Sequence, residues 1–380
     1  MINDPIELFP SSCLRLFLSA DLVGSTAFKQ ASEMGDGEKV QKWLEPIGAF
    51  FAGIQRHLDY QWGVSQKIAG DEIADQNHEL PRFWKAAGDE VIYVMEIDSP
   101  LQPLFAVTTF GEAISSYRRE LQEISPNLGI KGTAWLAGFP VNNAEIVLGG
   151  KRQLPDGHPS LDDWWVQHLY KRYLYETSPL PNGKEVLDFI GPQMDLGFRL
   201  SAKSTQRRMM LSVDLAMMLM KTCERPQGDL AARFNVENRI FFDGTETLKG
   251  VLAGLPYPLI WLDAQQGNPL NRAEDEIRGR EPPKSDKVIS FCSEFIAQAG
   301  QQHSWVIEPF IMQGGAEVFG AEPDKHSQAL SRMQQTWDNN KAVLDDVEPE
   351  DAEGDSDSLA LDVALAAAKF LIGKTLKSDK

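Results

Sequence analysis

The chain is poor in the features that mark secreted, membrane-spanning and zinc-binding proteins. Its three cysteines, Cys13, Cys223 and Cys292, are far apart and odd in number, so they indicate neither a disulfide framework nor a metal knuckle. No stretch reaches the roughly 18 consecutive apolar residues that a membrane span needs, and the opening MINDPIELFP has no basic segment followed by an apolar one. The six histidines show no ligand spacing. We therefore expect a soluble, cytoplasmic protein without a membrane segment or a zinc site.

Positive charge is scarce as well. The 380 residues include 37 Lys and Arg against 55 Asp and Glu, which gives a formal net charge of −18. Proteins that bind nucleic acid need a basic surface to displace counterions from phosphates, so no nucleic-acid partner is expected. The hydrophobic content of 42% is ample for a large core. Any nucleotide must be held by a local group of residues.

Strands and helices alternate along the first half of the chain. An apolar, β-prone run, LRLFLSADLV, leads into the turn and helix of GSTAFKQ. The elements expected after it are a helix over 40–54 with a kink at Pro46, two short strands around a Gly-Asp turn in 82–97, a helix over 103–123, strands over 128–139, and a helix or strand at 143–148. The pattern favours an α/β protein.

The second half gives weaker signals. KEVLDFIG is typical of a strand, QMDLGFRLSAKS of a helix, RRMMLSVDLAMMLMKTC of a strand followed by a helix, and TLKGVLAGLPYPLIWL of a hairpin. The methionines of this region are expected to fill the core.

One hexapeptide pattern, Lys-x-Ala-Gly-Asp-Glu, occurs twice, in QKIAGDEIADQ and in FWKAAGDEVIYVMEI. The second copy lies between strand-forming neighbours, so its Asp89 should stand at a rigid turn between strands. The first copy, with Asp71, is followed by loop-forming residues. A metal-binding carboxylate has to be held within a fraction of an ångström, which rigid elements do better than loops. We therefore favour Asp89 and interpret Asp71 as a surface look-alike.

A second carboxylate, Asp21, ends the strand of FLSADLVGST and is followed at once by a Gly-Ser-Thr turn into a helix. Free backbone N–H groups at such a turn favour a phosphate. Two strand-borne aspartates beside an anion-binding turn are suited to two-metal phosphoryl transfer. Ordinary loop chemistry explains these residues equally well when they are taken alone.

These motifs, in this order, resemble those of the class III nucleotide cyclases, over about residues 14–263. The resemblance implies an α/β (α+β) fold with a ferredoxin-like βαββαβ catalytic domain, and two Mn²⁺ or Mg²⁺ ions as cofactors. Residue by residue, it implies the following roles: Asp21, the carbonyl of Leu22 and Asp89 as metal ligands; Gly24, Ser25, Thr26, Ala27 and Phe28 as the phosphate turn; Lys85 and Asp188 as base contacts; Arg199 as the residue that stabilises charge on the α-phosphate; Lys249 as a triphosphate contact.

The chain departs from the family where it has Asp195 in place of the transition-state asparagine, since a carboxylate cannot donate the hydrogen bond that an amide donates. We keep Asp195 as a catalytic candidate. The resemblance also implies a homodimer with shared active sites, in which the metal aspartates come from one protomer and the Arg, Lys and base contacts from the other.

The architecture resembles one branch in particular, the pyrimidine cyclases of bacterial antiphage (Pycsar) systems. That branch implies UTP as substrate, cyclic UMP as a second messenger in antiviral defence, and an effector that responds to the cyclic nucleotide. Phe50 and Phe51 would favour UTP if they crowded the space of a purine's second ring; alternatively they are core residues. Lys85 and Asp188 instead fit the purine-binding pair of adenylate cyclases, so cytidylate and adenylate cyclases remain alternatives.

The expected organisation is a catalytic domain over 1–263 with insertions near 55–80 and 150–183, an additional α/β region over 264–342 packed on it, an acidic disordered linker over 343–357 and a helix over 358–380. Two other functions stay open. A degenerate cyclase domain would bind a nucleotide and signal through its tail, and a diguanylate-cyclase-like palm would share the paired acids, although AAGDE lacks the first Gly of its Gly-Gly-Asp-Glu turn.

Overall fold

The computed structural model describes residues 12–31, 43–70, 79–149, 185–225, 232–311 and 319–345. These residues belong to two compact units. One is formed by residues 13–137 and 195–321, and the other by residues 138–194 together with the chain from 322 onward. Asp71 and the expected insertion over 150–183 lie outside the described residues.

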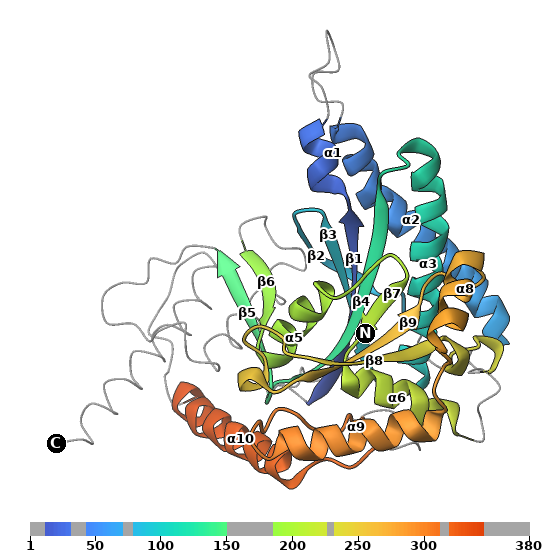
Figure 1. Ribbon diagram of the computed structural model, residues 1–380. Coiled ribbons are helices and arrows are strands. Elements are labelled where there is room, and N and C mark those ends of the chain that lie inside the picture. Colours follow the sequence, from blue (N-terminus) through green and yellow to red (C-terminus); the bar gives the residue numbers. More distant parts are fainter. Residues whose placement is uncertain are drawn as a thin grey trace, which may run out of the picture. The chain divides into compact units, whose positions relative to one another are not determined.

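A seven-stranded sheet organises the larger unit (Figure 1). Its strands, in spatial order, are β2 (Arg82–Ala87), β3 (Glu90–Ile97), β1 (Cys13–Val23), β4 (Gly129–Phe139), β7 (Arg208–Leu211), β9 (Tyr257–Asp263) and β8 (Ile240–Glu246). In the chain, β1 is followed by helices, then by β2 and β3, then by a helix and β4. This βαββαβ order, with β1 between β3 and β4, is the ferredoxin-like arrangement and confirms the expected fold class.

The alternation of side chains along β1 decides which face of the sheet the helices cover. Leu16, Leu18 and Ala20 are fully buried in the core that α2 (Leu44–Ala69) and α3 (Leu101–Ile124) complete. Two further helices continue this layer, α6 (Val213–Cys223) and α9 (Ser285–Gly300), which pack against each other. The methionines of β7 and α6 are buried in the same core, as the sequence predicts.

Aromatic rings cover part of the opposite face. Phe17 of β1 stacks on Trp135 of β4 with 5.3 Å between ring centroids, and Phe198 of α5 (Pro192–Ser201) lies 5.9 Å from Trp135. Gly197 is required in α5, because a Cβ atom there would lie 2.3 Å from the Trp135 ring. The close approach sets the C-terminal half of α5 against this face of the sheet.

The smaller unit contains an antiparallel pair, β5 (Ala144–Gly149) and β6 (Glu185–Ile190), and the helix α10 (Asp324–Asp345). The side chain of Asn143 binds Gln193, with 2.7 Å from its Nδ2 to Gln193 Oε1. Because β5 spans Ala144–Gly149, the element expected at 143–148 is a strand and not a helix.

Three element boundaries differ from expectation. The helix expected over 40–54 begins at Leu44 and continues to Ala69, so residues 55–69 are helical. Pro46 causes no kink because it lies in the first turn, where its missing N–H has no helical acceptor to lose. The first hairpin strand is β8, and TLKGVLAGLP forms the connection to β9, with a short 3₁₀ turn (η3, Leu252–Gly254).

The regular structure described within 264–342 is mainly helical. It comprises α8 (Pro269–Arg278), α9 and most of α10, and its β structure is limited, in the residues the structure describes, to a bridge between Ile311 and Phe319. The described elements of this region are thus mainly helices. Residues 343–345, expected in the acidic linker, end α10, while the remaining linker and the helix expected over 358–380 lie outside the described residues. Within the described ranges, no helix is both long and apolar enough to cross a bilayer.

Candidate functional site

Two predicted metal ligands meet at one edge of the sheet. Asp21 lies near the end of β1, directly opposite Glu90 of β3, and Asp89 occupies the turn between β2 and β3. The backbone N–H of Leu22 donates to the carbonyl oxygen of Asp89 at 3.1 Å. The fold thus brings Asp89 next to Asp21 and Leu22, from which it is distant in the sequence.

The turn after β1 is shaped by Gly24, whose φ of +87° lies in the left-handed region. A Cβ atom at this position would lie 2.6 Å from the carbonyl oxygen of Asn127, so a side chain is excluded by both conformation and space. The turn leads into α1 (Ser25–Ala31), and Phe28 N–H donates to the Gly24 carbonyl at 2.9 Å. The predicted phosphate turn is therefore the first turn of a helix.

Residues of α1 contact Asp89. The buried hydroxyl of Ser25 donates a hydrogen bond to Asp89 Oδ2, and the Lys29 ammonium lies 4.0 Å from the same oxygen. The sequence predicts Ser25 as a phosphate ligand. In the structure its hydroxyl orients the Asp89 carboxylate.

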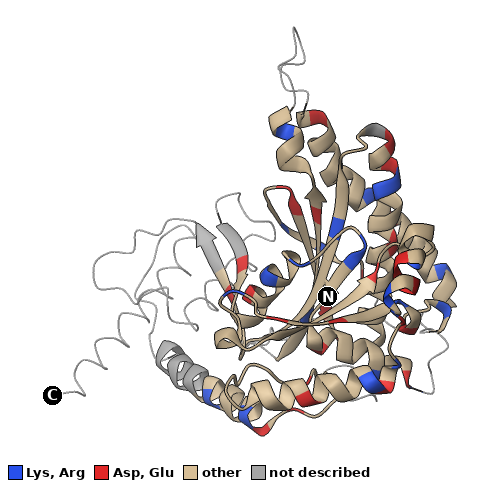
Figure 2. Ribbon diagram, viewed as in Figure 1, with Lys and Arg blue, Asp and Glu red and all other residues tan. Residues whose placement is uncertain are grey.

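Asp21 has a closer cationic partner, which sequence reasoning missed. The Nζ atom of Lys131, on β4, lies 2.9 Å from Asp21 Oδ2. The same ammonium donates to the backbone carbonyl oxygen of Ser201, the last residue of α5, at 3.2 Å. Figure 2 shows acidic and basic positions next to one another across these strands, at the end nearest α1.

A third carboxyl group, that of Glu90, completes the cluster. Burial raises the pKa of Glu90 above its ordinary value, and the negative charge of Asp21 raises it further. Hydrogen bonds donated by the hydroxyls of Ser19 and Ser201 to Glu90 Oε1 oppose the rise. Glu90 is therefore held firmly between β1 and the end of α5.

The donor atoms of this edge suit Mg²⁺ or Mn²⁺. Both ions prefer oxygen ligands, and Mg²⁺ is commonly bound through one or two carboxylates together with substrate phosphates. Among the described residues there is no group of three or more His, Cys, Asp or Glu side chains arranged to hold a metal by themselves. Asp21 and Asp89, with the Leu22 carbonyl, fit a metal that is shared with a phosphate.

The other predicted site residues are distributed over both units. Lys85 of β2 lies 4.1 Å from the centre of the Trp84 ring and 5.6 Å from that of Phe198 on α5. Asp195 and Arg199 are exposed one turn apart on α5, and Lys249 is exposed in the β8–β9 connection.

Asp188 belongs to the smaller unit. It lies on β6, where its carboxylate accepts a hydrogen bond from the N–H of Phe189 at 2.9 Å.

Two aromatic residues considered for base selection belong to the core. Phe50 is fully buried, with its ring centroid 6.3 Å from that of Tyr117, and Phe51 packs against the same cluster. Both rings pack against other side chains of the hydrophobic core. The residue-level reason to favour a pyrimidine is thereby lost.

Weak signals for Lys131 and Glu90 were present in the sequence. Lys131 interrupts the apolar run LGIKGTAWLAG, and a lysine within a strand of buried residues requires a nearby negative group. Glu90 directly follows Asp89 at the start of a buried strand. The partners of Lys131 and Glu90 depend on which strands pair, and neither stretch of sequence specifies that pairing.

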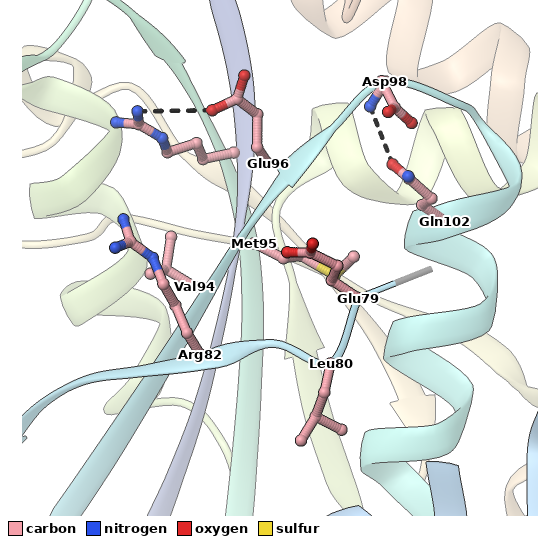
Figure 3. Close-up of a pocket in the computed structure, with 9 residues that line it drawn as sticks. Glu79, Leu80, Arg82, Val94, Met95, Glu96, Asp98 and Gln102 are labelled. Carbon is pink, nitrogen blue, oxygen red and sulfur yellow. Dashed lines mark hydrogen bonds and ion pairs between the residues drawn. The ribbon is translucent and has the colours of Figure 1, made fainter. Parts of the chain in front are cut away.

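A hollow of about 430 Å³ lies at the far end of the same strands (Figure 3). Arg15 and Glu96, opposite each other on β1 and β3, form an ion pair of 3.7 Å at its wall. Arg15 precedes Asp21 by six residues, roughly 20 Å along an extended strand. The hollow is therefore separate from the carboxylate edge. Its lining residues are Arg15, Glu79, Leu80, Arg82, Val94, Met95, Glu96, Asp98 and Gln102.

Comparisons with known proteins give structural neighbours only. No protein-family model matches the chain, and no curated protein matches it. The adenylyl cyclase CyaB from P. aeruginosa is 12% identical, with 68% of this chain and 98% of that chain covered and a TM-score of 0.42. The guanylyl cyclase Cya2 is 13% identical, with coverages of 69% and 96% and a TM-score of 0.35. The guanylate cyclase domain of RhGC from Catenaria anguillulae, in complex with GTP, is 10% identical, with coverages of 68% and 100% and a TM-score of 0.37.

Proposed function

We propose that this chain is a nucleotide cyclase that converts a nucleoside triphosphate into a 3′,5′-cyclic nucleotide and pyrophosphate. The observation that carries the proposal is the pair of carboxylates, Asp21 and Asp89, which a backbone hydrogen bond of 3.1 Å from Leu22 to Asp89 keeps at one edge of the sheet. Ser25 contacts the Asp89 carboxylate and Lys131 contacts the Asp21 carboxylate. Such an edge is suited to a reaction in which charge on phosphate oxygens has to be neutralised.

In the reaction, the 3′-oxygen forms a bond to the α-phosphorus, its proton is lost, and the bond from the α-phosphorus to the leaving pyrophosphate breaks. Bound Mg²⁺ or Mn²⁺ would supply activation of the attacking hydroxyl and neutralisation of the leaving group. Asp21, the carbonyl of Leu22 and Asp89 would hold the two ions. The turn over 24–28 and Lys249 would bind the phosphates, and Arg199 would stabilise charge that develops on the α-phosphate.

The remaining assignments are part of the same proposal. Lys85 and Asp188 contact the base, and Asp195 orients the ribose as an acceptor in place of an amide. Arg199 and Asp195 are exposed on α5, which suits contacts with a nucleotide held by a second protomer. We propose a homodimer with shared sites, UTP as the preferred substrate, cyclic UMP as a messenger in antiviral defence, and an effector that responds to it.

The test is pyrophosphate release from a nucleoside triphosphate in the presence of Mn²⁺. We expect Asp21→Ala and Asp89→Ala each to lower the rate by at least about a hundredfold, as loss of a group that neutralises transition-state charge does. Asp71→Ala, in the other Lys-x-Ala-Gly-Asp-Glu copy, is the matched control and should retain the wild-type rate. If Asp71→Ala loses activity and Asp89→Ala stays fully active, the site contains Asp71 and the assignment to Asp89 is wrong.

Base preference needs a separate measurement, since the buried position of Phe50 leaves the protein without an identified residue that excludes purines. ATP, GTP, CTP and UTP are incubated singly with protein and Mn²⁺, and the products are identified by mass spectrometry. Cyclic UMP as the main product supports the pyrimidine assignment. Cyclic AMP alone would show that Lys85 and Asp188 select a purine and would remove the basis of the antiphage proposal.

A binding module without catalysis is the second candidate. One observation favours it: lysines lie beside both carboxylates, with Lys131 at 2.9 Å from Asp21 and Lys29 at 4.0 Å from Asp89. Because these ammonium groups already neutralise the carboxylates, a metal ion is not needed there. Such a module would bind a nucleoside triphosphate, measured by calorimetry, and release neither pyrophosphate nor a cyclic product from any of the four substrates.

A further inference from the structure

We propose that Lys131 is a built-in counter-charge of Asp21 that competes with a divalent metal, and that its displacement loosens the end of α5, the helix that carries Asp195 and Arg199. Lys131 is thus a positioning residue that links the metal edge to this helix. The inference rests on the proposed metal-binding role of Asp21.

The first observation is the ion pair itself. Lys131 Nζ lies 2.9 Å from Asp21 Oδ2, and the two side chains are only 20% and 24% exposed. Charges that are largely withdrawn from water interact more strongly than exposed ones, because solvent screens them less. The ammonium therefore satisfies the Asp21 carboxylate directly, in the region where a metal would have to bind.

The second observation is the other contact of the same ammonium. Lys131 Nζ donates to the carbonyl oxygen of Ser201 at 3.2 Å. Ser201 ends α5, and the carbonyl groups of a last helical turn have no helical donor and carry partial negative charge. One ammonium thus joins Asp21 on β1 to the C-terminal end of α5.

A third contact makes the end of α5 dependent on this edge. The Ser201 hydroxyl donates to Glu90 Oε1 at 3.2 Å, and Glu90 is opposite Asp21 in the β1–β3 register. Upstream in the helix, Gly197 is in close contact with Trp135. At its other end, α5 is held by Gln193, which binds Asn143. Among these contacts, those of Ser201 involve the charges around Asp21.

Competition follows from these contacts. A divalent cation bound to Asp21 repels an ammonium at the same carboxylate, so the stem of Lys131 has to turn away. Because one Nζ atom makes both contacts, turning away from Asp21 also removes the hydrogen bond to Ser201. We expect metal binding to be weakened by Lys131 and to loosen the last turn of α5.

The experiment compares wild type with Lys131→Met, which keeps the length of the stem and removes the charge. Binding of Mn²⁺ without nucleotide is measured by calorimetry, with Lys221→Met as the matched control, since Lys221 forms a comparable ion pair of 2.8 Å with Glu308 away from the site. We expect Lys131→Met to bind Mn²⁺ about tenfold more tightly than wild type, and Lys221→Met to bind it as wild type does. Asp21→Asn defines the signal of a protein without the proposed metal ligand.

Hydrogen exchange gives a second, independent readout. The N–H groups of Lys203 and Ser204 donate to the carbonyl oxygens of Leu200 and Ser201 at 2.8 and 3.2 Å. In wild type, Mn²⁺ should speed exchange of these two amides. In Lys131→Met, exchange should already be fast without metal and should not increase further.

The outcomes separate this inference from the proposed function. Mn²⁺ binding that is equal or weaker in Lys131→Met, but lost in Asp21→Asn, overturns the counter-charge role and leaves the metal site intact. Mn²⁺ binding that is the same in wild type and Asp21→Asn overturns the metal site, and with it this inference. If Lys131→Met unfolds, Lys131→Arg serves in its place and should reproduce wild-type competition, because it keeps the positive charge; tenfold tighter binding in that variant would contradict the proposal.

Discussion

The N–H group of Leu22 donates a hydrogen bond of 3.1 Å to the carbonyl oxygen of Asp89, and this bond joins the end of β1 to the turn between β2 and β3. Both residues belong to the proposed metal-binding set. The bond fixes the two backbones relative to each other, and side-chain contacts orient the carboxylates. The relative position of these two backbone segments is therefore set by the pairing of strands in the sheet.

Ser25→Ala should weaken metal binding while leaving the fold intact. The Ser25 hydroxyl donates to Asp89 Oδ2, and hydrogen bonds to charged groups contribute about 1.5–3 kcal/mol. Without it the Asp89 carboxylate is free to turn, so we expect the affinity for Mn²⁺ to fall about tenfold in calorimetry. Ser293→Ala, which removes a similar hydroxyl-to-carboxylate bond to Glu308, is the control and should bind as wild type does.

Gly24→Ala should lower the free energy of unfolding by roughly 2–4 kcal/mol. A side chain at this position has to accept a positive φ, at a cost of about 1 kcal/mol or more, and its Cβ would also lie 2.6 Å from the Asn127 carbonyl oxygen. Gly244 has the same φ of +87° and open space around its Cβ position, so Gly244→Ala isolates the conformational cost. Urea denaturation measures both. Equal losses in the two variants would contradict the role of the contact with Asn127.

The stability contributed by Asp275 should depend on pH. Hydrogen bonds from Arg207, together with the charges of Arg207 and Arg280, lower the pKa of Asp275 below its ordinary value of 3.8, although burial opposes the shift. A carboxylate whose pKa is lower in the folded state stabilises the fold above the unfolded pKa, and this contribution is lost as the pH falls through the folded pKa.

The corresponding measurement is the difference in unfolding free energy between wild type and Asp275→Asn. We expect a difference of roughly 1–3 kcal/mol at pH 7, which shrinks steadily below about pH 4. Asp286→Asn is the control, since its exposed pair with Lys287 at 3.5 Å should contribute less than about 1 kcal/mol at any pH. A difference for Asp275→Asn that stays constant from pH 7 to pH 2 would rule out this linkage.

Shared active sites predict complementation between inactive variants. Asp21→Ala and Arg199→Ala are each expected to be inactive, yet a heterodimer of the two contains one site whose metal ligands and arginine are both intact. Mixing them should restore up to about a quarter of the wild-type rate, since half of the dimers formed by random exchange are heterodimers with one working site each. The readout is pyrophosphate release, with mass spectrometry to show that heterodimers form. No recovered activity in a sample rich in heterodimers would exclude shared sites.

Local sequence patterns predicted the order of the elements from β1 to β4 and singled out Asp21 and Asp89 as candidate metal ligands. The apolar, β-prone run of β1, the Gly-Asp turn between β2 and β3 and the apolar face of α3 are all local patterns. Periodicity and turn chemistry act over a few residues, so they can be recognised without knowing which strands become neighbours. Asp21 and Asp89 were identified in this way, and their roles stay predictions.

The surroundings of those carboxylates depend on the packing of segments that are distant in the sequence. Lys131 meets Asp21 because β4 lies next to β1, and Ser201 meets Glu90 because Gly197 lets α5 approach Trp135. Likewise, Phe50 belongs to the core because α2 packs against α3, which a helical pattern alone cannot distinguish from a pocket wall. Partners and burial depend on long-range packing of distant segments, and the free energy of that packing is not contained in any short stretch of sequence.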